Sequence, residues 1–246
     1  MKKTLLTLSF FLVNITTNAQ YCPDNNHPHA IDLGLPSGTL WACCNVGASS
    51  PEDNGNYYAW GETETKYRYE SDNCKTYHRQ FNDIAGTQYD VAHVQWGDYW
   101  QMPTIEQINE LRSKCVYTWM LNGALFRGPN GNKLYLPAAG RYYQTNIVSL
   151  NQYGYYWSSS PHNNDESYWM WLLPYDAASE KVFRFFGQPV RPINISTNNI
   201  YNKTYNNVSA QAVYNLYGIK VADSTTEINN QSPGIYIVNG KKIVIK

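Results

Sequence analysis

Residues 103–114 read Pro-Thr-Ile-Glu-Gln-Ile-Asn-Glu-Leu-Arg-Ser-Lys and contain the clearest helix signal in the chain. Thr104 is followed three residues later by Gln107, which is the capping-box pattern, in which each side chain accepts a hydrogen bond from a backbone N–H of the first turn. Apolar residues recur at three-residue spacing from Ile105 to Leu111, so one face of the helix is apolar. The stretch therefore predicts a helix that packs this face on a core.

Short strand candidates separated by Gly, Asn and Pro surround this helix. A strand is expected at 38–44, after a Pro-Ser-Gly turn, and one helical turn at 90–94. The other strand candidates follow the helix, at 116–120, 124–127, 133–136, 155–159, 168–175, 181–186 and 189–193. Many short strands with few helices predict the α+β class, with a mainly antiparallel sheet and one or two helices. Residues 62–88 are polar and irregular, which predicts a long surface excursion.

The composition excludes several classes of protein. The 246 residues carry 19 Lys+Arg and 19 Asp+Glu, so the formal net charge is zero and nucleic acid is not expected as a partner. The 22 Tyr and 8 Trp argue against a disordered chain, and a charged fraction of 15% argues against a coiled coil. This composition favours a β-rich, loop-rich protein that presents a polar surface outside the cell.

The first 19 residues have the pattern of a secretory signal peptide. Lys2 and Lys3 form a positive start, residues 5–13 are a short apolar core, and Thr17 and Ala19 supply the small residues before a cleavage site. The apolar core is too short to cross a bilayer, and no other segment approaches 18 apolar residues, so no transmembrane segment is expected. The sequence predicts export, with a mature chain that starts at Gln20.

Composition changes again near the end of the chain. The segment 194–207 is rich in Asn, Thr and Ser and indicates a linker. Beyond it, strand candidates at 210–216, 219–222, 234–238 and 242–245 include an Asn-Gly hairpin signal at 239–240. The predicted organisation is a signal peptide (1–19), an α+β domain (20–193), a linker (194–204) and a small all-β module (205–246).

An ordered set of motifs relates the α+β domain to a known family. The motifs are residues 32–48, 57–62, 96–97, 102–104, 136–140, 155–160 and 187–192. Together they resemble the Fibrobacter succinogenes major paralogous domain family of secreted bacterial proteins, over about residues 30–192. The resemblance implies a C-type-lectin-like fold, related to the sulfatase-modifying and DUF1566 groups, and implies no established activity.

The sequence lacks the motifs by which related groups of proteins bind calcium or carry out cysteine chemistry. Calcium-dependent lectins hold sugar through motifs that are replaced here, because Val190 follows Gln188-Pro189 and Ser158 follows Trp157. The sulfatase-modifying enzymes use a late cysteine pair, and no cysteine follows Cys115. His27 and His29 have no third ligand near them in the sequence, so neither a metal nor a cofactor is expected.

The end of the chain resembles a C-terminal sorting domain of type IX secretion. The matching stretches are residues 213–221 and 233–242. The resemblance implies the secretion machinery as a partner, and a location either secreted or on the outer-membrane surface of a Gram-negative bacterium.

The loop 161–167 between two strand candidates is the predicted ligand site. In C-type-lectin-like folds, loops on one side of the domain form this site. Amide and carboxylate groups bind sugar hydroxyls, and an aromatic face stacks on a sugar ring. Five residues in or near the loop have such side chains and are the candidate ligand-binding residues. They are Asn163, Asn164, Asp165, Glu166 and Trp169. The alternative is a variable, solvated hairpin loop.

No catalytic motif is present, so the chain is not expected to be an enzyme. The carboxylate pairs Glu62/Glu64 and Asp165/Glu166 could serve a glycosidase, but such neighbours are more often solvated. The sequence favours a non-catalytic binding module for an extracellular glycan or for a host or bacterial surface protein. A structural or variable surface protein without a specific ligand, or a hydrolase, are the alternatives.

Export makes a disulfide plausible among the five cysteines. A bond between Cys44 and Cys115 is predicted, because both lie beside motifs of the paralogous domain. Cys74 is the rival partner, and Cys43 is expected on the opposite face of a strand.

Overall fold

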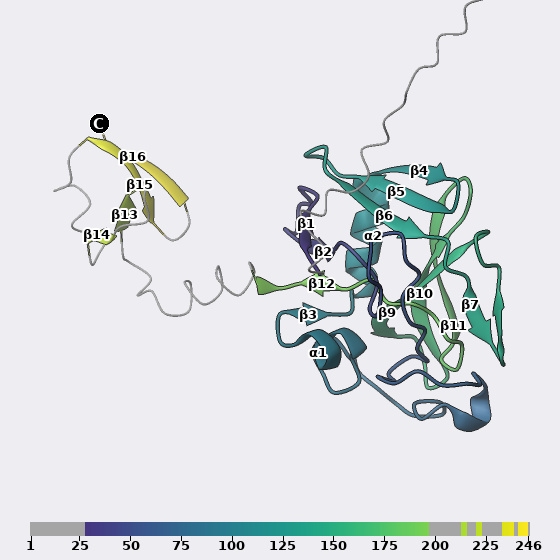
Figure 1. Cartoon of the computed structure of the whole chain (residues 1–246). Coiled ribbons are helices and arrows are strands. Elements are labelled where there is room, and N and C mark those ends of the chain that lie inside the picture. Colours follow the sequence, from purple (N-terminus) through teal and green to yellow (C-terminus); the bar gives the residue numbers. More distant parts are fainter. Residues whose placement is uncertain (1–27, 197–212, 216–219, 223–232, 239–240, 246) are drawn as a thin grey trace, which may run out of the picture.

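The computed structural model describes residues 28–196, 213–215, 220–222, 233–238 and 241–245, and it confirms the α+β class (Figure 1). Within these ranges the α-helices are α1 (Val91–Trp96) and α2 (Ile105–Lys114), and one short 3₁₀ helix, η1, covers Ser71–Asn73. All paired strands of the described ranges run antiparallel. The fold is therefore mainly antiparallel sheet, as the sequence predicts.

The strands of residues 28–196 form four small sheets. The first has the order β1-β2-β12-β3, with β1 (Ala30–Asp32), β2 (Leu40–Ala42), β12 (Ile193–Asn194) and β3 (Trp100–Gln101). The second consists of β4 (Val116–Met120), β5 (Gly123–Arg127) and β6 (Lys133–Pro137). The third has the order β11-β10-β9, with β11 (Ala177–Phe183), β10 (Glu166–Leu172) and β9 (Gly154–Pro161). The fourth pairs β7 (Arg141–Tyr143) with β8 (Asn146–Val148).

Helix α2 lies at the centre of the domain and forms as its sequence predicts (Figure 1). Thr104 accepts from the backbone of Gln107, and the Gln107 side chain accepts from the backbone N–H of Thr104. Ile108 and Leu111 are fully buried. Each such side chain stabilises the fold by roughly 1.5–3 kcal/mol through its removal from water.

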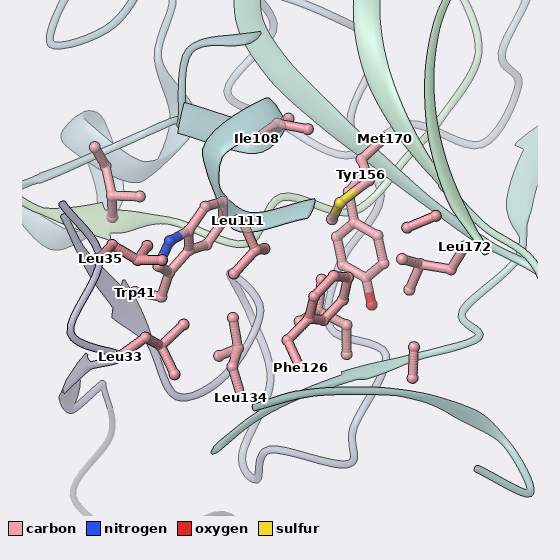
Figure 2. Close-up of a cluster of buried hydrophobic side chains, with 14 residues drawn as sticks. Leu33, Leu35, Trp41, Ile108, Leu111, Phe126, Leu134, Tyr156, Met170 and Leu172 are labelled. Atoms are coloured by element: carbon pink, nitrogen blue, oxygen red, sulfur yellow. The ribbon is translucent and has the colours of Figure 1, made fainter. Parts of the chain in front are cut away.

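The apolar face of α2 packs in a first core cluster to which three of the sheets contribute side chains (Figure 2). Ile108 and Leu111 meet side chains from β2, β5, β6, β9, β10 and β12 there. The largest of these are Trp41, Phe126, Leu134, Tyr156, Met170 and Leu172. One helix thus joins three sheets in a single core.

Alternation along β9 and β10 builds a second cluster on the other face of the third sheet. Tyr156 and Met170 belong to the first cluster, whereas their neighbours Tyr155, Trp157 and Trp169 belong to the second. Successive side chains of a strand point to opposite faces, so a run of apolar residues supplies both cores. Strand β9, in which every residue except Pro161 is buried, packs on both faces for this reason.

Two strands differ from their predicted extent. The strand expected at 38–44 ends at Ala42, so Cys43 and Cys44 lie in a bend and the strand-alternation argument does not apply to them. The hairpin β7–β8 has no counterpart in the prediction, because its turn contains neither Gly nor Pro. Gln144 takes the left-handed conformation there, with φ of 55°.

The structure corrects the prediction of a Cys44–Cys115 disulfide. No two of the described cysteines, which include Cys43 and Cys74, lie within disulfide distance. Cys115 ends α2 and packs at the margin of the first cluster, whereas Cys44 is buried in the bend after β2. The fifth cysteine, Cys22, lies outside the described residues, as does the predicted signal peptide.

A separate sheet forms near the end of the chain, in the order β14-β13-β15-β16. Its strands are β13 (Val213–Asn215), β14 (Lys220–Ala222), β15 (Gly234–Val238) and β16 (Lys241–Ile245). Val238 pairs with Lys241, which is the register of the two-residue hairpin that the sequence predicts. Within the described ranges, these strands share no sheet with residues 28–196.

The first domain extends further than its predicted end at residue 193. Asn194 belongs to β12, where it pairs with Leu40 and Trp100, and it is only 7% exposed. The backbone N–H of Ile195 donates to Tyr99 at 2.9 Å. The first domain therefore includes Asn194 and Ile195. None of the described helices is long and apolar enough to cross a membrane.

We expect a chain truncated after Ser196 to fold like the full chain, because the strands β13–β16 pair only among themselves in the described ranges. Its melting temperature should stay within about 2 °C of that of the full chain, a change of well under ~1 kcal/mol. Truncation after Ile193 is the matched control. This shorter chain should have a clearly lower melting temperature, because the truncation removes half of β12. Loss of cooperative unfolding in the longer fragment would contradict this domain boundary.

Candidate functional site

The turn between β9 and β10 presents the predicted loop on the surface. Asn163, Asn164, Asp165 and Glu166 line one open concavity of about 610 Å³, and Phe183 completes it. Phe183 is there because it lies directly opposite Glu166 in the pairing of β10 with β11. The structure thus brings together four of the five predicted ligand-binding residues.

Asn163 organises this loop from within. Its side-chain oxygen accepts from the backbone N–H of Asp165 and of Glu166, both at 2.8 Å. Its amide nitrogen donates to Glu166 Oε2 at 2.8 Å. These bonds form an Asx-type turn, which fixes the backbone and one carboxylate oxygen before any ligand arrives.

Contacts to other segments hold the loop against the domain. The carbonyl of Asn163 accepts from Arg184 Nη2 at 2.5 Å, and Arg184 N donates to the carbonyl of Asp165 at 2.9 Å. Asp165 Oδ1 accepts from the backbone N–H of His78 at 3.1 Å and lies 2.7 Å from His78 Nδ1. The ring of His78 lies 4.1 Å from that of Tyr77, measured between centroids. The long excursion therefore forms one wall beside the loop.

The remaining groups of the concavity are available to a ligand. Asn164 is exposed, and its side-chain amide has no hydrogen bond to any described residue. Phe183 is 43% exposed and stacks on Phe185 at 5.4 Å. Asp165 and Glu166 make the surface acidic. The concavity can bind hydroxyl or cationic groups and pack an apolar face on one ring.

Trp169, the fifth predicted residue, does not join the concavity. It is 6% exposed and stacks on Tyr155, with ring centroids 5.1 Å apart. Its position in β10 directs it into the second cluster, along the strand from the loop. The aromatic ring that lines the concavity is Phe183 instead. The sequence alone does not place Phe183 beside the loop, because this position depends on the register of β11 against β10.

Other candidate groups have structural partners. Glu62 is buried and binds Lys66 at 2.8 Å, and it also accepts from the backbone of Lys75. Within the described part of the chain, no group of three or more His, Cys, Asp or Glu could hold a metal ion.

No family model matches the chain, no curated protein is significantly similar to it, and no solved structure matches its fold.

We predict that Trp169→Ala acts mainly on stability. Removing this buried ring from the second cluster should cost about 3–5 kcal/mol of the free energy of unfolding, measured in denaturant. Asn164→Ala, in the concavity, is the control and should change the free energy of unfolding by less than about 0.5 kcal/mol. A Trp169→Ala protein of unchanged stability would contradict the placement of this ring in the core.

Proposed function

We propose that the chain is an exported, non-catalytic surface module that binds an extracellular glycan or protein through the concavity of Asn163–Glu166 and Phe183. The observation that carries this proposal is the convergence of four polar residues and one exposed ring on a loop fixed from inside. A loop already held in its binding conformation loses little entropy on association. That property is useful for binding and is not required of a passive surface.

The chemistry of the concavity narrows the ligand. Asp165 and Glu166 are acceptors, and Asn164 offers both a donor and an acceptor. Such a surface suits neutral hydroxyl-rich sugars or the cationic side chains of a protein, and it repels anions. Phe183 supplies the flat apolar face that sugar rings and aliphatic stems pack against.

The sequence supports the location in this proposal. The pattern of residues 1–19 is that of a signal peptide, and residues 205–246 resemble a sorting domain of type IX secretion. The resemblance to the paralogous domain family supports a C-type-lectin-like domain in which loops serve as the ligand site. We place the protein outside the cell or on the outer-membrane surface of a Gram-negative bacterium.

The proposal is tested by a binding screen of the mature chain against a glycan array and extracellular proteins. For a ligand found in this way, Asn164→Ala and Phe183→Ala should each weaken the affinity by about tenfold or more, because each removes a direct contact. Lys114→Ala, an exposed change at the end of α2, should leave the affinity unchanged.

Two results would contradict this function. Absence of saturable binding to any probe would favour a structural or variable surface protein. Turnover of a bound glycan or peptide, lost in Glu166→Gln, would favour a hydrolase.

A further inference from the structure

Arg141 lies among aromatic rings of the second cluster, on one face of the third sheet. It belongs to β7 and is half-buried. Its guanidinium carbon lies 4.1 Å from the ring centre of Phe186, 4.7 Å from that of Tyr155 and 5.9 Å from that of Trp169. The rings hold the guanidinium through cation–π attraction, which leaves its hydrogen-bonding edge unused.

No described residue provides an acceptor for this guanidinium. Arg141 Nε is buried and has no hydrogen bond, and no ion pair joins Arg141 to a described carboxylate. The two Nη atoms also have no hydrogen bond to a described residue, but they are not fully buried, so solvent can reach them. Burial lowers the pKa of Arg141 below its ordinary value, yet a guanidinium stays protonated at neutral pH.

Two indole N–H groups of the same aromatic cluster also lack a hydrogen-bond acceptor. Trp169 Nε1 and Trp171 Nε1 are buried, and neither has a hydrogen-bond acceptor among the described residues. Their rings lie 5.8 Å apart, and both stack on Tyr155. Since buried donors without acceptors destabilise a fold, three of them in one cluster are unusual. All three are donors, so the buried polar atoms that lack a partner in this cluster are N–H groups and none is an acceptor.

We infer that the Arg141 site, defined as Arg141, Tyr155, Trp169, Trp171 and Phe186, binds the carboxylate of an acidic saccharide. The two solvent-accessible Nη atoms of the planar guanidinium can donate two parallel hydrogen bonds to a carboxylate. The site goes beyond the proposed function. It consists of other residues than the concavity at Asn163–Glu166, and its charge is positive where that of the concavity is negative.

The rim of the site favours a sugar acid over an acidic peptide. Tyr143 is 45% exposed and packs on Phe186 at 5.4 Å, and Trp171 is half-buried. Tyr143 extends the apolar surface of Phe186, which is the ring nearest to the guanidinium. A sugar acid carries its carboxylate on the ring itself, so the charge and an apolar C–H face arrive together. An aspartate or glutamate side chain brings the charge on a flexible stem and no such face.

The test measures binding of the mature full-length chain to trigalacturonate and sialyllactose, by calorimetry and by tryptophan fluorescence. Saturable binding of at least one of them is expected, with a change in fluorescence and with weakening as salt is raised. The neutral partners galactotriose and lactose should bind at least about tenfold more weakly, and triglutamate should bind more weakly than the sugar acids.

Variants separate the site from general charge attraction. Arg141→Met should weaken binding of the sugar acid by about tenfold or more, and Arg141→Lys should weaken it to a lesser degree because it keeps the charge and loses the fork. Lys181→Met removes an exposed charge on β11 and should have no effect. If Arg141→Met does not fold, the loss in Arg141→Lys decides.

Several outcomes overturn the inference. They are no saturable binding of either sugar acid, equal binding of the neutral sugars, tighter binding of triglutamate, or unchanged affinity in the Arg141 variants that fold.

Discussion

The buried guanidinium of Arg184 connects segments that no sheet connects. Its side chain is fully buried and donates to four acceptors: the carbonyls of Thr76, Arg79 and Asn163, and the hydroxyl of Ser167. Its flat face lies 4.2 Å from the ring centre of Trp60. Burial lowers the pKa of Arg184 to about 10, so it remains charged at neutral pH. Backbone carbonyls therefore compensate a buried cation, and the cation in turn satisfies loop carbonyls that no strand pairs.

A second buried arginine has the same arrangement. Arg191 is buried and donates to the Asn45 side chain and to the carbonyls of Ala42 and Cys43. A chain with short strands and a long irregular excursion has many backbone groups outside ladders, and each buried one needs a partner. Two arginines close to each other in the sequence supply these partners from inside. The proposed ligand loop depends on this, because the carbonyl of Asn163 is one of the acceptors of Arg184.

Local sequence patterns were sufficient to predict those elements that depend on interactions between neighbouring residues. The capping box at Thr104 and the Asn-Gly hairpin signal depend on neighbours in the chain, and both appear in the structure as predicted. Trp169 and the hairpin β7–β8 were not predictable in this way, because burial of a ring depends on the register of other strands. The role of Arg184 leaves no local trace, since its partners are carbonyl groups distant in sequence. The disulfide rested on motif positions and not on any distance, which explains its failure.

Hydrogen exchange in Arg184→Met, with the free energy of unfolding from denaturant, tests the role of this guanidinium most directly. The substitution keeps an apolar stem and leaves four acceptors without their donor. We expect a loss of about 3 kcal/mol or more, since each buried unsatisfied group costs roughly 1–3 kcal/mol. Amides at 76–79 and 162–166 should exchange much faster, while those of α2 stay protected in the folded state. Unchanged exchange in both loop segments, at a stability equal to that of the unmodified chain, would contradict the account.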